Sequence, residues 1–195
     1  QPIMSGEGST EWIAISKGRT EALRKLAAQS GSTQFVATLT VFGVLLHDFS
    51  REGSFIVGTP VRARMVAEVE AIMGYFNNLL LLPLAVKPNA TFLDLLKCVR
   101  AGVVESFAVP GVPLEQLERA LTNANGKSAK VVYQALFSFQ DARQRATQWG
   151  DLRHSMIPLF QQGATEDLGM WFVESADGLQ GGLTYNTDVF HADTA

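Results

Sequence analysis

The chain has 195 residues, of which 47% are hydrophobic and 18% are charged, so it is a folded globular protein with a sizeable core and not a disordered segment. A net charge of −3 without a basic run argues against nucleic acid as a partner. The longest apolar stretches, residues 35–46 and 79–86, are shorter than the roughly 20 residues of a membrane helix. We therefore expect no membrane segment, and we see no signal-peptide pattern.

The N-terminal third predicts a short strand followed by two helices. Residues 1–11, rich in Gly, Ser and Glu, are typical of a linker or a frayed end. Residues 12–15 alternate like a strand, and Ser16 can cap a helix that runs to about Gln29. Thr33 then opens a more apolar helix, which we expect to be buried on several sides.

The middle of the chain alternates strands and helices. Residues 54–61 and 79–86 are apolar strands, and the second predicts a sheet covered on both faces. Thr91 begins a helix with a capping-box pattern, and Pro113 fits the start of another. Cys98, the single cysteine, is predicted to lie buried on the apolar side of its helix; it excludes an internal disulfide and fits a reducing cytoplasm.

After residue 128 the pattern changes to strands. Four segments look extended: residues 131–139, 152–159, 168–174 and 179–187. Gly181 and Gly182 inside the last segment indicate a bulge or a close backbone approach. The fold class we predict is α/β, a mixed sheet with helices packed on it.

Two motifs lie between the apolar strands of the middle region. The first is Gly58-Thr59-Pro60-Val61, which leads to Arg64, and the second is residues 73–78, reading MGYFNN. Both look like polar turns, and polar groups between buried strands must be satisfied or used. They therefore predict one wall of a functional site.

Five segments, in order, resemble the motifs of nonribosomal peptide synthetase condensation domains. They are residues 57–64 (VGTPVRAR), 73–80 (MGYFNNLL), 109–117 (VPGVPLEQL), 125–137 (NGKSAKVVYQALF) and 183–190 (LTYNTDVF). No single motif is specific, but the five in this order are. The resemblance runs from about Thr10 to the C-terminus.

The resemblance implies a chloramphenicol-acetyltransferase-like subdomain, residues 12–195, the C-terminal half of a two-lobed domain. The catalytic histidine motif of the family belongs to the first half, and here His47, His154 and His191 stand apart. We therefore expect no catalytic residue in this chain, no metal site and no activity of the chain alone. The partners implied are the N-terminal half and carrier proteins, whose phosphopantetheine arms carry the substrates.

Arg64 is the best functional candidate that the resemblance offers. In the family, the arginine closing this motif pairs with an aspartate of the histidine motif and braces the active-site loop, a role that suits a planar guanidinium. The alternatives are a solvated arginine, or Arg62 in its place. Asn78 matches the family's asparagine near the meeting of the halves, where it either contacts a crossing loop or pantetheine, or is satisfied structurally.

Two further polar residues, Gln134 and Ser138, are predicted to share one face of a strand. They line a substrate tunnel or, equally, a solvent-facing surface. A lone histidine such as His154 is more often structural than catalytic, so we interpret it as structural. Residues 141–151, which include Arg143 and Arg145, are a candidate for the loop that closes the tunnel.

Several positions depart from the family pattern. Val109, Pro110 and Gly111 replace a His-Gln-Asp triplet, and Asn125 and Ala129 replace arginines. Two functions stay open: an acyl-transfer half that forms amide bonds between carrier-bound thioesters, or a degenerate, non-catalytic module that docks carrier proteins or scaffolds a synthetase. Epimerisation is disfavoured because an Asn-Tyr pair is missing near Phe137.

Overall fold

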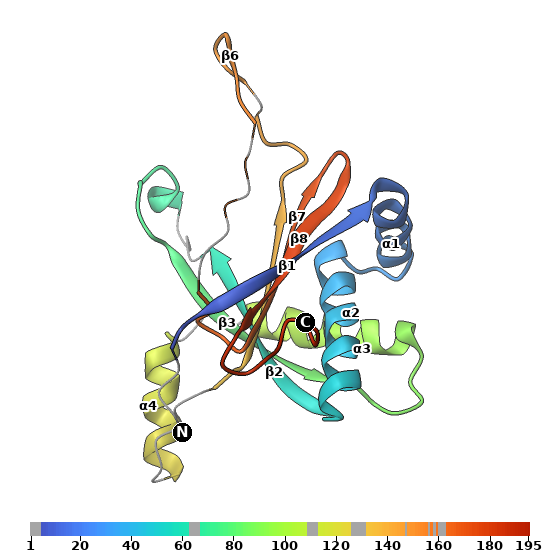
Figure 1. Cartoon of the computed structure of the whole chain (residues 1–195), viewed down its shortest axis with the longest axis vertical. Coiled ribbons are helices and arrows are strands. Elements are labelled where there is room, and N and C mark those ends of the chain that lie inside the picture. The colour runs from blue at the N-terminus through green and yellow to red at the C-terminus, as the bar shows by residue number, and fades with distance from the viewer. Residues whose placement is uncertain are drawn as a thin grey trace. The chain divides into compact units, whose positions relative to one another are not determined.

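The computed structural model describes residues 5–62, 67–108, 113–125, 132–146, 148–155, 157, 159 and 163–195 (Figure 1). The chain forms two compact units. Unit 1 consists of the residues up to Leu26 together with Ser138–Ala195, and unit 2 of Ala27–Phe137. Among the described residues, no helix combines the length and the apolar character that a membrane span requires.

Unit 1 is built on an antiparallel sheet of strands that are distant in sequence. The strand β1 (Gly8–Ser16) pairs with β8 (Gly178–Asn186), which also pairs with β7 (Leu168–Ser175). The strand β1 thus begins inside the segment that composition assigns to a linker, because β8 supplies it with backbone partners. The helix α1 (Lys17–Gln29) follows directly after Ser16, as predicted.

The register of β8 runs without an offset through Gly181 and Gly182, so the glycine pair marks a close approach and not a bulge. A Cβ atom on Gly181 would lie 1.9 Å from the carbonyl oxygen of Trp171. The predicted strand over 152–159 is wrong. Of the described residues in this segment, only Leu152–Arg153 (β6) are extended, and they pair with Gln148–Trp149 (β5). Figure 1 shows this hairpin projecting beyond the ends of β7 and β8.

Unit 2 contains a mixed sheet with helices. The strand β2 (Ser54–Arg62) pairs antiparallel with β3 (Asn77–Ala85) and parallel with the start of β4 (Ala135–Asp141). The helices are α2 (Gln34–Ser50), α3 (Phe92–Ala108) and α4 (Leu114–Asn125), with a short 3-10 turn, η1, at Ala67–Val69. The helix α3 packs on β3 and on α2, which confirms the predicted α/β class.

The helix boundaries follow from local chemistry that the sequence shows. Thr33 caps α2 by accepting a hydrogen bond from the Val36 N–H at 3.3 Å, and Thr91 does the same for the Asp94 N–H at 3.2 Å. In the core of unit 2 the Phe42 ring stacks on Phe137, with centroids 5.7 Å apart.

Cys98 is exposed, so its predicted burial is wrong. The buried face of α3 is formed by Leu95, Leu96, Val99 and Val103. At 100° per residue Cys98 lies to one side of that face.

The Gly-Thr-Pro motif is not a turn, which corrects its interpretation from sequence. Gly58, Thr59 and Pro60 lie inside β2, opposite Leu81, Leu80 and Leu79 of β3. Pro60 lies past Val57 and Gly58, through which β2 pairs with β4, and proline is tolerated at such positions. Gly58 is needed for close packing, because a Cβ atom there would lie 2.9 Å from the ring of Tyr133.

Replacing this glycine tests the packing. We expect Gly58→Ala to lower the free energy of unfolding by about 1–3 kcal/mol, since the Tyr133 ring must shift. Urea denaturation followed by circular dichroism measures the effect. Gly18→Ala in α1 is the matched control, because a Cβ there meets nothing within 4 Å and alanine favours helix by up to about 1 kcal/mol. Equal stability of the two variants would contradict the assigned role of Gly58.

Candidate functional site

The segment around Arg64 is described only up to Arg62, the last residue of β2. Arg64 itself lies outside the described residues. The guanidinium of Arg62 donates to Glu70 Oε2 at 2.5 Å, and both side chains are exposed. Arg62, the rival for the bracing role, therefore has a partner within unit 2, and Arg64 stays the candidate.

Asn78 lies in β3, half-buried, directly opposite Val61. The register places it beside the end of β2 that leads to residue 64. Asn77 faces Arg62 in the same way. Both asparagines of the second motif thus flank the strand end from which the predicted bracing arginine follows, and their roles stay predictions.

Gln134 and Ser138 do not share a regular strand. The strand β4 begins at Ala135, one residue after the exposed Gln134, whereas Ser138 is half-buried within it. Gln134 and Asn78 belong to unit 2, and Ser138 to unit 1. A common tunnel wall made by the three residues therefore remains a prediction.

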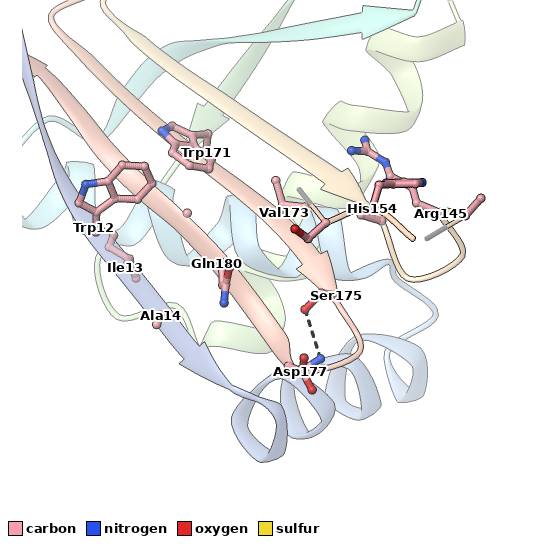
Figure 2. Close-up of a pocket in the computed structure, with 14 residues that line it drawn as sticks. Trp12, Ile13, Ala14, Arg145, His154, Trp171, Val173, Ser175, Asp177 and Gln180 are labelled. Carbon is pink, nitrogen blue, oxygen red and sulfur yellow. Dashed lines mark hydrogen bonds between the residues drawn. The ribbon is translucent and has the colours of Figure 1, made fainter. Parts of the chain in front are cut away.

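Unit 1 contains a cavity of about 700 Å³ that motif comparison does not find (Figure 2). We call it the tryptophan cavity, after Trp12 of β1 and Trp171 of β7. Figure 2 shows the two indoles toward one end and Arg145 with His154 toward the other. Val173 and Gln180 also line it. The signal available in the sequence is the alternation of Trp171, Val173 and Ser175, which puts these residues on one sheet face.

A second feature that sequence reasoning missed is a buried carboxylate. Glu174 of β7 is only 1% exposed, and it forms ion pairs with Arg24 of α1 and, at 3.7 Å, with Arg143. Arg143 also binds Asp141 through three hydrogen bonds, two from its guanidinium at 2.9 and 2.5 Å and one from its backbone N–H at 3.1 Å. These bonds lower the pKa of Asp141 to about 2 and raise that of Arg143.

The described residues include no candidate metal site. No group of three or more His, Cys, Asp or Glu side chains able to hold a metal ion is present there. His47 Nδ1 lies 2.7 Å from the carbonyl oxygen of Glu52, at the end of α2. His154 differs, because its Nε2 atom is buried and has no hydrogen-bond partner among the described residues.

A family model described as the Condensation domain matches residues 4–195. The chain belongs to the condensation-domain family. It is 32% identical over 197 residues to the phosphinothricin tripeptide synthetase PhsC of Streptomyces viridochromogenes, covering 98% of this chain and 18% of that protein. It is 31% identical to surfactin synthase subunit 1 of Bacillus subtilis, covering 100% of this chain and 5% of that protein. The resemblance predicted from the five motifs is thus confirmed at the level of the family.

Solved structures agree on the fold. The X-domain from teicoplanin biosynthesis matches with a TM-score of 0.84 at 22% identity, covering 100% of this chain and 45% of that one. A four-domain nonribosomal peptide synthetase bound to AMP and glycine matches with a TM-score of 0.84 at 23% identity, over 98% of this chain and 16% of that one. The chain therefore spans less than half of these relatives.

The buried ion pairs of this condensation-family chain can be tested by substitution. We expect Glu174→Ala to lower the free energy of unfolding by about 2–4 kcal/mol, because two arginines lose their partner and a buried volume empties. Glu70→Ala, which breaks the exposed pair with Arg62, should cost less than about 1 kcal/mol. Urea denaturation compares the two variants, and similar losses would show that Glu174 has no special role.

Proposed function

We propose that the chain is the second half of a condensation domain, which forms amide bonds between aminoacyl or peptidyl groups carried as thioesters on carrier proteins. The catalytic histidine motif belongs to a first half, residues 12–195 form the second, and the protein works in the cytoplasm. Family membership supports the reaction class. The observation that carries the half-domain assignment is the apolar surface of the chain.

In unit 1, large apolar side chains are exposed on and after the β5–β6 hairpin. Trp149, Leu152, Ile157 and Leu159 are between 69% and 84% exposed. Four large, strongly exposed apolar side chains within eleven residues are unusual for a monomeric protein, and such a concentration supports an interaction surface. We assign this surface to contact with the first half, as the crossing loop predicted nearby would require.

Unit 2 exposes a second apolar segment at the MGYFNN motif. Met73 and Tyr75 are 98% and 88% exposed, just before β3 begins at Asn77. An exposed position is unfavourable for these side chains unless a partner covers them. We propose that this loop also meets the first half, and that Asn78 holds the backbone there or contacts the pantetheine arm.

The chemical contribution of this half is to hold the two substrates in position. In the proposed tunnel, the acceptor amine attacks the donor thioester, and holding the two together supplies several kcal/mol of the barrier reduction. The histidine of the first half positions or deprotonates the amine. Arg64 braces the loop that holds this histidine, and Gln134 and Ser138 line the tunnel. Phosphopantetheine arms of carrier proteins deliver both substrates.

A second candidate function is a non-catalytic docking module. It is favoured by the replaced residues at Val109–Gly111, Asn125 and Ala129 and by the match to an X-domain that has been solved in complex with OxyB. A domain with this fold therefore binds another protein. This candidate predicts carrier-protein binding without peptide formation.

The role of Arg64 separates the two functions. In the whole protein, we expect Arg64→Ala to lower the rate of peptide formation at least tenfold, because an unbraced loop misplaces the histidine. Arg62→Ala is the matched control: it removes the neighbouring cation, which pairs with Glu70, and should leave the rate within about twofold. Carrier proteins loaded with aminoacyl groups and analysis of the product by mass spectrometry give the rates.

Two outcomes oppose the proposal. Equal rates for the Arg64 and Arg62 variants, with normal folding, would contradict the bracing role. If the unmodified protein binds loaded carrier proteins but forms no peptide with any of them, the docking function replaces the catalytic one.

A further inference from the structure

The floor of the tryptophan cavity is shaped by a glycine between two indoles. Gly182 of β8 lies opposite Trp12 on one side and opposite Trp171 on the other. With no side chain between them, the two indoles approach edge to face, with ring centroids 5.5 Å apart and planes at 86°. A Cβ atom on Gly182 would lie 2.7 Å from Thr10 Cγ2 and 3.4 Å from Trp171 Cζ2. The sheet therefore presents two indoles to the cavity, which meet edge to face and form an angled aromatic surface.

The far wall carries a polar atom that needs a partner. The His154 ring lies on the Trp149 ring, with centroids 4.3 Å apart and planes at 33°. Its Nε2 atom is buried without a hydrogen bond to any described residue, although His154 lines the cavity. A buried polar group without a partner costs free energy, so an occupant that offers it a hydrogen bond is stabilised.

The charges around the cavity favour a neutral occupant. Arg145, whose guanidinium donates to Gln140 Oε1 at 2.8 Å, and Asp177 are the ionised side chains among the described lining residues. Their charges are opposite, so neither a cation nor an anion gains a net attraction. The volume of about 700 Å³ falls within the usual range of small-molecule sites.

We propose that the tryptophan cavity binds the side chain of a carrier-bound aminoacyl substrate, and that this side chain is aromatic with a neutral hydrogen-bonding group at its edge, as in a tyrosyl group. The ring packs on Trp12 and Trp171, and the polar edge pairs with His154 Nε2. This inference rests on the proposed condensation function. It adds the substrate class and names His154 as a residue that determines specificity.

The test compares three loaded carrier proteins, bearing tyrosyl, phenylalanyl and leucyl groups, in peptide formation by the whole protein. We expect the tyrosyl group to exceed the phenylalanyl group in kcat/KM by about 3–10-fold, the value of one neutral hydrogen bond. His154→Phe keeps a ring on Trp149 and removes the nitrogen atoms, so this preference should fall to about one. His191→Phe, at an exposed histidine, is the matched control and should keep it.

A second variant tests the aromatic surface. Trp12 is half exposed on the edge strand β1, so Trp12→Leu should fold, as circular dichroism checks, and should reduce the preference for both aromatic groups over leucyl. Turnover of leucyl substrates with no aromatic preference, or a tyrosyl preference unchanged by His154→Phe, would overturn the inference and leave the condensation function intact.

The inference also has a readout that does not depend on turnover. Saturation-transfer NMR measures binding of N-acetyl-L-tyrosinamide and N-acetyl-L-phenylalaninamide to the whole protein. Tighter binding of the tyrosine compound, lost in the His154→Phe variant, supports the cavity assignment even if no peptide forms and the condensation function fails. Binding of neither compound, or equal binding of both, contradicts it.

Discussion

The buried carboxylate of Glu174 is the constraint on which unit 1 depends. Removing a carboxylate from water is expensive unless hydrogen-bonding cations surround it, so Arg24 and Arg143 must be brought to β7. Arg24 comes from α1, and Arg143 follows directly after β4. A backbone hydrogen bond joins the same two segments, because the Ala142 N–H donates to the carbonyl oxygen of Glu174 at 2.8 Å. One side chain thus fixes a helix, a strand and the start of the segment that carries Arg145 and His154.

That segment contributes both to the tryptophan cavity and to the exposed apolar surface of unit 1. Arg145 and His154 line the tryptophan cavity, and the apolar side chains of the β5–β6 hairpin follow the same stretch of chain. The buried charge of Glu174 attaches the start of the segment to β7, while the exposed residues beyond it are available to a partner. Arg143, which belongs to the predicted tunnel-closing segment, forms its described contacts with Asp141 and Glu174.

The sequence predicted those parts of the fold that local chemistry determines. Thr33 and Thr91 marked helix starts because their hydroxyls cap backbone N–H groups, and apolar runs located β2, β3, β7 and β8. The sequence predicted the strand over residues 54–61 correctly, but it failed where Gly58–Pro60 was also interpreted as a polar turn, because these residues pair with β3 inside the strand. It also failed for Cys98, whose place beside the buried face of α3 depends on the exact phase of the helix.

Only those residues of the candidate site that belong to family motifs could be predicted from the sequence. Family motifs drew attention to Arg64, Asn78, Gln134 and Ser138. The tryptophan cavity and the buried Glu174 depend instead on pairings such as Trp12 with Gly182 and Arg24 with Glu174, whose members lie 150 or more positions apart. Nothing local to Trp12 shows that Gly182 and Trp171 lie beside it in the sheet. Both features depend on which strands pair and in which register, and a single sequence does not reveal this pairing.

The central claim is that a first half covers the apolar segments of this chain. Hydroxyl-radical footprinting of the whole protein tests it, because Met73, Tyr75 and Trp149 react readily when exposed. The account predicts strong protection of all three relative to Phe49, an exposed aromatic residue of α2 that lies outside both segments. Modification of the three side chains at the rates expected from their exposure in this chain would contradict it.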